Sequence, residues 1–563
     1  MDANADADAD RATHSGNDDY YDLGAFDRRV TTSSRDGQKW FNRGLVWAYA
    51  FNHGESVRCF ERAAALDPAC VMASWGIAFS LGPNYNKPWG VFDDDELVAI
   101  VDRSRRALAR AADNASSAAP VEQALVAALQ HRYPHGNATP AKGYVWNREY
   151  AAAMEAVHRT FPDDPDVSAL YVDAIMNLTP WQLWDLRTGE PAKGARTLEA
   201  KAALERGLSR DPLHPGLLHL YIHLMEMSRR PELAMAAADN LRGLVPDAGH
   251  LNHMPTHLDI LCGDYRRAIA SNLRAIAADE RFVARDGPMN FYSLYRCHDY
   301  HFCIYAAMFA GQFAVALETA SRLEATLPET LLRVESPPMA DWLEGFLAMR
   351  VHVLIRFGRW QDIADLEVPA DPDLYCTTTA MAHYAKGVAS AVTGQIDDAD
   401  RQCALFHKAV ERVPSSRTVF NNTCVDILAI AAAMLDGELE YRRGNVELGF
   451  GHLRRAIDLD DSLPYDEPWG WMQPTRHAYG ALLLEQGRVE EAAAVYCADL
   501  GFDDALPRAL QHRNNVWALH GYHECLTKLG RDAEARIVDT HLQLAVAVAD
   551  VPIKSSCFCR SNL

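Results

Sequence analysis

The sequence predicts an all-helical protein built as a solenoid of helical hairpins. Apolar residues recur at helical spacing along almost the whole chain, which is rich in alanine, leucine, glutamate and arginine. Glycines followed by a polar residue and a new helical pattern occur at regular intervals, at Gly263, Gly311, Gly394, Gly444, Gly487 and Gly530. Such a glycine ends one helix in the left-handed conformation and the next helix starts at once, so we expect a string of hairpins.

The length of 563 residues argues against one compact core and favours several domains or an extended repeat array. Hairpins that recur about every 34 residues, with small residues near the helix ends, resemble tetratricopeptide repeats. The predicted fold class is therefore a tetratricopeptide-repeat-like α-solenoid, with curling into a closed superhelix as an option. The clearest hairpins are expected at 38–68, 216–246, 250–280, 290–326, 380–413, 434–460, 474–500 and 514–545.

The repeat pattern divides the chain into five parts. They are a disordered acidic tail (1–24), N-terminal helical repeats (25–200), central repeats with a histidine-rich site (201–330), C-terminal repeats (331–548) and a second tail (549–563). Segments rich in proline, glycine, tryptophan or asparagine are expected to be loops between repeats, at 83–97, 136–146, 179–195 and 281–289.

Composition limits the classes of partner. The formal net charge of -21 repels phosphate backbones and anionic membrane surfaces, so we expect no nucleic acid and no membrane partner. No apolar run approaches the roughly 18 residues of a membrane helix, and the acidic start lacks a secretory signal. The cysteines are scattered, which favours free thiols in the cytoplasm. Cys557 and Cys559 lie in the second tail.

Histidines recur in register over the central repeats. We counted back 13, 10 and 6 positions from Arg229, Gly263 and Gly311, which close the first helices of three hairpins. Seven of these nine equivalent positions are histidine, although histidine is only 22 of 563 residues. The candidate metal ligands are His219, His223, His250, His253, His257, His298 and His301.

The register predicts a shared metal site. Offsets of three, four and seven residues share one helix face, and neighbouring helices lie about 8–10 Å apart, so the imidazoles can converge. Glu226 follows His223 by three residues and is the candidate catalytic residue, as a ligand, an orienting group or a proton acceptor. Pro255 belongs in a first helical turn, so we expect His250 and His253 at or before a helix start.

Other features are weaker. His477, His520 and His523 can join the site only if the superhelix closes on itself, and His53 is expected to cap a helix. The tryptophan-rich segment 466–474 is interpreted either as a hydrophobic plug between hairpins or as a substrate lid.

Six stretches resemble a tetratricopeptide-repeat family of bacteria and fungi whose members are mostly uncharacterised. They are WFNRGLVWAYAFNHGESVRCFERAAALDP (40–68), SWGIAFSLGPNYN (74–86), HLYIHLMEMS (219–228), AGHLNHMPTH (248–257), CHDYHF (297–302) and YDEPWGWMQPTR (465–476). The resemblance covers about residues 25–545. Its histidine motifs (HxxxHxxE, GHLxHMPxH and HxxHF) imply a shared site at the seven histidines and Glu226.

The ligand types narrow the metal. Cys262, Cys297 and Cys303 fall outside the register, so thiolate ligation is not indicated. Carboxylate-bridged di-iron sites in helical bundles use about four glutamates with two histidines. Imidazole suits copper, zinc, iron and nickel, and six or more imidazoles favour two ions with three each. We therefore expect two copper ions, with zinc or iron as alternatives.

Three functions follow. The first is a copper-dependent oxidoreductase of specialised metabolism that uses dioxygen on a small organic substrate. The second is a zinc hydrolase or lyase in which three histidines hold an activating ion. The third is a non-catalytic scaffold whose groove binds a protein partner, as repeat grooves commonly do. Without a metal, the histidines would form a pH sensor, a structural hydrogen-bonded ladder or a groove for an acidic peptide.

Overall fold

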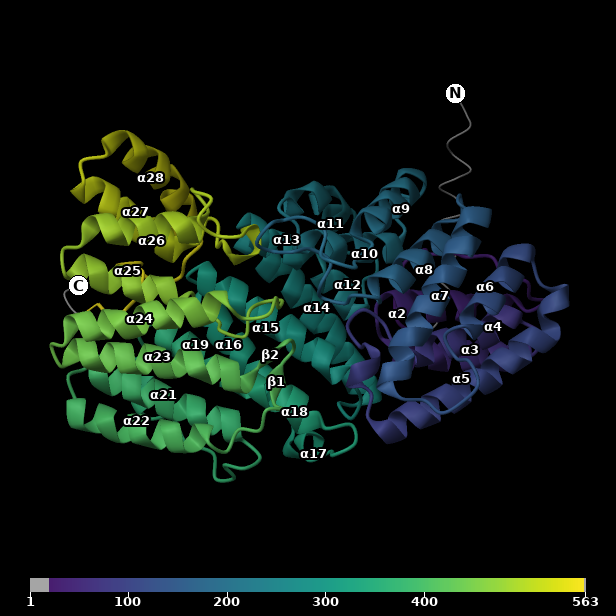
Figure 1. Cartoon of the computed structure of the whole chain (residues 1–563), viewed down its shortest axis with the longest axis horizontal. Coiled ribbons are helices and arrows are strands. Elements are labelled where there is room, and N and C mark those ends of the chain that lie inside the picture. Colours follow the sequence, from purple (N-terminus) through teal and green to yellow (C-terminus); the bar gives the residue numbers. More distant parts are fainter. Residues whose placement is uncertain (1–19, 561–563) are drawn as a thin grey trace.

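The chain is an all-helical solenoid of hairpins, as predicted (Figure 1). The computed structural model describes residues 20–560. Within that range the only strands are β1 (Thr418–Val419) and β2 (Asn422–Thr423), which pair antiparallel. No helix in the described part is both long and apolar enough to cross a membrane. The six expected turn glycines all have positive φ, including 78° at Gly263 and 70° at Gly311.

The N-terminal helices begin where Ser34 caps the first of them by accepting a hydrogen bond from Gly37 N (3.0 Å). The expected loop 136–146 is mostly helical, because Thr139 caps a helix that has Pro140 in its first turn. The elements are α2 (Arg35–Tyr49), α3 (His53–Leu66), α4 (Val71–Leu81), η1 (Trp89–Val91), α5 (Asp94–Asn114), η2 (Ala115–Ser117), α6 (Pro120–Gln130), α7 (Pro140–Thr160), α8 (Pro165–Met176) and α9 (Thr197–Arg210).

The central helices follow a loop at 179–195, as expected. The segment 281–289 is partly helical instead of a loop, because the helix before it runs on to Asp286 and ends at Gly287, where φ is 72°. The elements are α10 (Pro215–Glu226), η3 (Pro231–Ala234), α11 (Met235–Leu241), α12 (Gly249–His253), α13 (Pro255–Cys262), α14 (Tyr265–Asp286), α15 (Ser293–Phe309) and α16 (Phe313–Ala325).

The C-terminal helices open with short elements and continue as long hairpins. The hairpin expected at 434–460 starts earlier, because Thr423 caps its first helix. The elements are α17 (Glu329–Leu332), α18 (Met339–Leu343), η4 (Glu344–Ala348), α19 (Met349–Arg356), α20 (Trp360–Ala364), α21 (Cys376–Val392), α22 (Ile396–Val410), α23 (Cys424–Arg442), α24 (Val446–Asp461), α25 (Thr475–Glu485), α26 (Val489–Leu500), η5 (Arg508–Leu510), α27 (Val516–Lys528) and α28 (Asp532–Val546).

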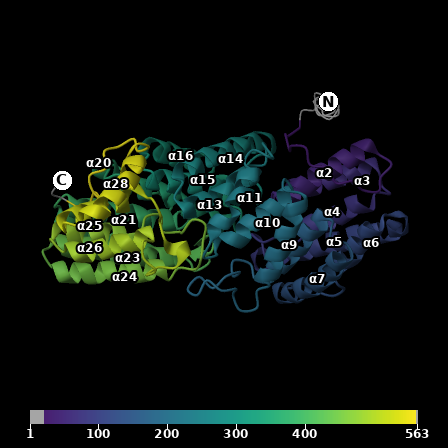
Figure 2. The same cartoon turned by 90° about the horizontal axis from the view of Figure 1, so that it is seen from above.

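The sequence left undecided whether the solenoid closes into a superhelix. In the structure the helices form two partial curls instead. Helices α2–α8 and α21–α28 lie at opposite ends of the long axis, and the central helices lie between them (Figures 1 and 2). In the first curl α2 returns to α10, where Tyr49 O accepts a hydrogen bond from His219 Nδ1 (2.6 Å). In the second, Trp517 on α27 donates to Met308 O on α15 (2.7 Å).

The buried apolar side chains form two large cores. One extends from Leu23 to Tyr295 and the other from Tyr265 to Cys559, so their sequence ranges overlap in the central repeats. The predicted division at residues 200 and 330 stays a prediction. The histidine-bearing helices α10, α12, α13 and α15 therefore lie where the two cores meet.

The described chain ends pack against the solenoid. Residues 1–19 of the predicted first tail lie outside the described residues, but Tyr20 donates to Glu55 Oε1 (2.5 Å) and Leu23 is buried. In the predicted second tail, the Asp550 carboxylate accepts a hydrogen bond from Phe313 N (2.6 Å) on α16. These segments therefore pack against α3 and α16.

The cysteines differ in part from the expectation of free thiols. Cys557 and Cys559 form a disulfide, and the other ten cysteines are free. Cys559 is buried against the second core.

Candidate metal centre

Helix α10 brings the first polar stripe into the interior. The helix begins at Pro215, where the His214 ring caps it by accepting a hydrogen bond from Leu217 N (3.2 Å). Every residue of α10 is buried, which is typical of a helix enclosed on all sides. The stripe of His219, His223 and Glu226 therefore faces protein instead of solvent.

The other histidines come from three neighbouring helices. His250 and His253 lie on α12, and His257 lies on α13, which starts at Pro255. As expected, His250 and His253 precede the start of a helix, which is α13. They are not in a loop, however, because they form the short helix α12. His298 lies on α15.

The first cluster, named group A, consists of His219, His223 and His250. One ring nitrogen of each lies within 4.8 Å of those of the others. His219 Nδ1 donates to the backbone carbonyl of Tyr49 (2.6 Å), and His223 Nδ1 lies 2.9 Å from Glu226 Oε1. The Nε2 atoms of these two rings, and both nitrogens of His250, are buried without a hydrogen-bond partner. Group A thus holds lone pairs that no protein donor satisfies.

The second cluster, named group B, consists of His253, His257 and His298, again with one nitrogen of each within 4.8 Å of the others. His253 Nδ1 lies 2.7 Å from Asn272 Oδ1, and the Nε2 atoms of His253 and His257 lie 2.7 Å apart. Both ring nitrogens of His298 lack a partner. Group B therefore repeats the arrangement of group A.

Two glutamates lie between the groups. Glu226 contacts His223 Nδ1 through Oε1 (2.9 Å) and His257 Nδ1 through Oε2 (2.5 Å), so one carboxylate orients a ring of each group. Glu467 Oε2 lies 3.1 Å from the same His257 nitrogen. Burial, and then the charge of Glu467, raise the pKa of Glu226 well above its usual value. A nearby cation would stabilise this carboxylate.

The two groups adjoin each other. The ring centroids of His223 and His257 are 5.5 Å apart, and those of His250 and His253 are 5.8 Å apart. Burial is the largest effect on the imidazoles, and neighbouring histidines add to it. It lowers the pKa of His219 to about 3, and it lowers the pKa values of His223, His250, His253 and His298 well below 6.5. These rings are neutral at pH 7, the form that binds metals.

His301 stands apart from both groups. Its Nε2 lies 2.7 Å from the sulfur of Met472, and its ring faces Phe346 at 5.5 Å. The structure therefore brings six of the seven predicted histidines together, and their role as ligands stays a prediction. The other candidates are also separate: His477 pairs with Asp499 (2.9 Å) in the second core, and His520 and His523 lie on α27.

Strained aromatic residues line the centre. The described residues include four non-glycine residues with positive φ, and three of them are aromatic: Phe51 (56°), Trp181 (62°) and Phe420 (48°). The ring of Phe51 lies 4.4 Å from that of His219, Trp181 lies 6.2 Å from His223, and Phe420 lies 4.8 Å from His298. A positive φ strains the backbone of a bulky residue, and such strained residues cluster at functional sites.

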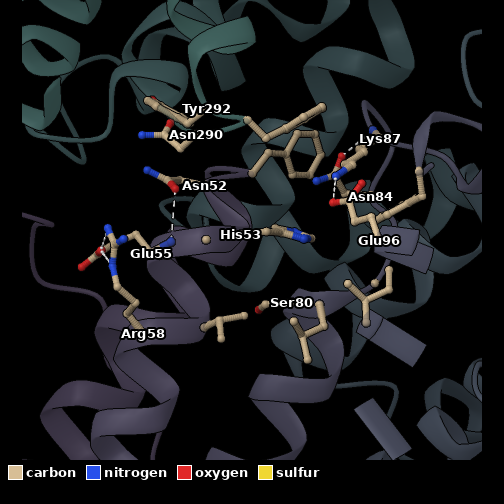
Figure 3. Close-up of a pocket in the computed structure, with 18 of the residues that line it drawn as sticks. Asn52, His53, Glu55, Arg58, Ser80, Asn84, Lys87, Glu96, Asn290 and Tyr292 are labelled. Atoms are coloured by element: carbon tan, nitrogen blue, oxygen red, sulfur yellow. Dashed lines mark hydrogen bonds and ion pairs between the residues drawn. The ribbon is translucent and has the colours of Figure 1, made fainter. Parts of the chain in front are cut away.

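Two cavities lie near the centre. One, of about 300 Å³, is lined by Phe51, Asn52, Lys87 and Tyr292 but by no histidine of group A (Figure 3). His53 also lines it and is not the helix cap that we expected; Asn52 is the cap and accepts a hydrogen bond from Glu55 N (3.3 Å). A second cavity, of about 420 Å³, is lined by His298 of group B.

Sequence reasoning missed several residues that build the centre. Glu467 lies in the tryptophan-rich segment, whose unusual composition was a signal, but no spacing rule links it to His257. Asn272 and the carbonyl of Tyr49 orient imidazoles from α14 and α2, and only the fold shows these contacts.

No protein-family model and no curated protein matches the chain. Among solved structures it is similar to the human IFIT1 dimer with m7Gppp-AAAA, with 11% identity over 93% of this chain and 92% of that chain, at a TM-score of 0.31. It is also similar to yeast Tom70 (11% identity, 91% and 93% covered, TM-score 0.30) and to Naa15/Naa10 bound to HypK-THB (12%, 90% and 70%, TM-score 0.21). Likenesses this weak say nothing about function.

The chain's own structure therefore defines its class. It is a tetratricopeptide-like helical solenoid with a buried histidine-rich centre.

Proposed function

We propose that groups A and B each hold one metal ion and that the protein is a metal-dependent oxidoreductase of a small organic substrate. The single observation that carries the proposal is the set of buried imidazole nitrogens that have no hydrogen-bond partner. They are Nε2 of His219 and of His223 and both ring nitrogens of His250 and of His298. His253 Nε2 and His257 Nε2, 2.7 Å apart, share one hydrogen bond, which a bound ion would replace.

The hydrogen bonds around the rings explain why a cation fits. A backbone carbonyl only accepts, so the proton of His219 resides on Nδ1 and its Nε2 carries a lone pair. When Glu226 is ionised, as it would be beside a bound cation, it accepts from Nδ1 of His223 and from Nδ1 of His257, and both Nε2 atoms then carry lone pairs. Converging lone pairs repel each other unless a cation lies between them, and leaving them buried and unpaired costs about 1–3 kcal/mol each.

The chain's own residues would then have separate tasks. The imidazoles bind, while Tyr49, Asn272 and Glu226 keep them in one tautomer and orientation. Glu226, whose pKa is raised, can also hold or pass a proton within the centre. Phe51 and Phe420 keep water away from the rings.

Two sets of three imidazoles without a thiolate favour copper, as the sequence predicts, and fit zinc or iron as well. When bound, a copper pair would supply oxidation of the substrate with dioxygen as electron acceptor. A single zinc ion would instead activate water for hydrolysis or lyase chemistry.

Elemental analysis of the full chain, purified without a histidine tag, tests the proposal. We expect two ions per chain, copper by preference, and consumption of dioxygen only with a reducing substrate. One zinc per chain without oxygen uptake would favour the hydrolase or lyase. Protein that binds no metal, and that chelators do not destabilise, would overturn the proposal.

A second candidate rests on the fold. Arrays of helical hairpins commonly act as non-catalytic scaffolds that bind a protein partner, and the helical architecture alone fits that role equally well. In that case the histidines would be a structural core, and substituting them would change stability without changing any metal content.

A further inference from the structure

The cavity of about 420 Å³ beside group B lies at the junction of the two curls. Its walls come from the segment before α5, from α15, from the region of α18 and from the β1–β2 turn. Cavities of this size between packed units are the usual sites for small ligands. His298 forms part of the wall, so the cavity adjoins group B of the proposed metal centre.

Large aromatic side chains dominate the lining. Trp181, Tyr295, Trp342 and Phe420 contribute rings from four separate segments. Flat rings on several sides favour a flat ligand, because aromatic groups gain from stacked and edge-to-face contacts as well as from burial. Trp181 and Phe420 are held there at positive φ, so the backbone is strained at the places where these rings stand.

The charged residues of the lining favour ligands that carry no negative charge. None of the described residues that line this cavity is lysine or arginine, whereas Asp93 and Asp341 both line it. Two cations next to the lining are already paired, Arg417 with Asp341 (3.5 Å) and Lys87 with Glu96 (2.6 Å). An anionic ligand would therefore lose its hydration there without gaining an unpaired cationic partner. A neutral or cationic ligand meets no such penalty.

An oxygen atom without a hydrogen-bond partner favours a ligand that carries a hydrogen-bond donor. Asn86 lines the cavity, and its Oδ1 is buried without a hydrogen-bond partner. A rotation of the Asn86 amide would turn this oxygen into the cavity, where a hydroxyl or amine on the ligand would satisfy it. Leaving the oxygen unpaired opposite a ligand without a donor would weaken binding.

From these features we propose that the cavity is the substrate site and that the substrate is an uncharged or cationic aromatic molecule with a hydroxyl or amine, such as a phenol or an arylamine. This inference rests on the proposed function for its link to catalysis. The binding of the ligand does not need the metal.

Titration of the full chain with three phenols tests the substrate class. Para-cresol is neutral, tyramine is cationic and para-hydroxyphenylacetate is anionic, and quenching of tryptophan fluorescence reports binding. We expect one saturable site for para-cresol and tyramine, and at least about ten-fold weaker binding of para-hydroxyphenylacetate. Equal binding of the anion, or no saturable binding of para-cresol, would overturn the inference.

Two variants locate the site. Trp342→Ala should weaken para-cresol binding by about ten-fold, whereas Trp360→Ala, which removes a half-buried tryptophan on α20, should leave it unchanged. Asn86→Leu should weaken para-cresol but not toluene, which has no donor; calorimetry measures both variants. Unchanged para-cresol affinity in both Trp342→Ala and Asn86→Leu would contradict the assignment.

The two proposals fail separately. Each titration is run on chelator-treated and on metal-loaded protein. Phenol binding by protein that takes up no metal would leave the cavity assignment standing and remove the proposed function. Metal binding with no phenol binding would do the reverse.

Discussion

Replacement of Glu226 tests the link between the two histidine groups. Its carboxylate accepts from His223 Nδ1 (2.9 Å) and from His257 Nδ1 (2.5 Å), one ring of each group. In Glu226→Gln only one oxygen remains, and the amide NH₂ faces the second Nδ1–H. One imidazole therefore loses its acceptor and is free to turn or to change tautomer.

The magnitude follows from the lost bond. A hydrogen bond to a charged group contributes about 1.5–3 kcal/mol, and removing a partner that orients a metal-bound histidine weakens metal binding by about 10- to 100-fold. Glu226→Ala loses both bonds and leaves a void, so its loss should exceed that of Glu226→Gln.

Competition with a chromophoric chelator measures the metal affinity. The matched control is Glu438→Gln, which changes a buried glutamate on α23 that pairs with Arg442 (2.7 Å) away from both groups. The control should bind metal as the unchanged protein does. Equal metal affinity in Glu226→Gln, Glu226→Ala and the control would refute the bridging role.

The remaining predictions concern single histidines. His223→Ala and His257→Ala should each lose tight metal binding at their own group, while circular dichroism shows unchanged helix content. His53→Ala should keep both metal binding and helix content. His301→Ala should keep both ions, because that ring faces Met472; loss of an ion would return His301 to the ligand set. Burial lowers the pKa of His352 to about 3, so the unfolded chain binds more protons below pH 6.5 and stability falls as the pH falls from there toward 3. At pH 5 this amounts to about 2 kcal/mol, so His352→Leu should lose that much less stability between pH 7.5 and pH 5 in urea unfolding; an unchanged pH dependence would exclude His352 as its source.

Local signals explain how much of the fold was predictable. Gly263 and Gly311 mark helix ends because only glycine adopts positive φ there without strain, and the hairpins follow from the spacing of such turns. The loop expected at 136–146 is wrong because Thr139 caps α7 and Pro140 occupies its first turn, two local signals that start a helix within the proline- and glycine-rich segment.

The site residues that recur with the repeat could be predicted from the sequence. Those that reach the site only because the solenoid curls could not. His219 and His253 are 34 residues apart, one repeat, and the fold brings both to the centre. His298 and His301 share a helix, but His298 joins group B whereas His301 contacts Met472 of the tryptophan-rich segment, a contact that the repeat register does not encode. Glu467 reaches His257 only through the packing of the tryptophan-rich segment, which no local pattern encodes.

X-ray absorption spectroscopy of the metal-loaded chain tests the central claim most directly. We predict a first shell of about three nitrogen ligands per ion near 2.0 Å, with the outer-shell scattering of imidazole and no sulfur. A shell of sulfur, or of oxygen without imidazole scattering, would contradict the assignment of groups A and B as the metal sites.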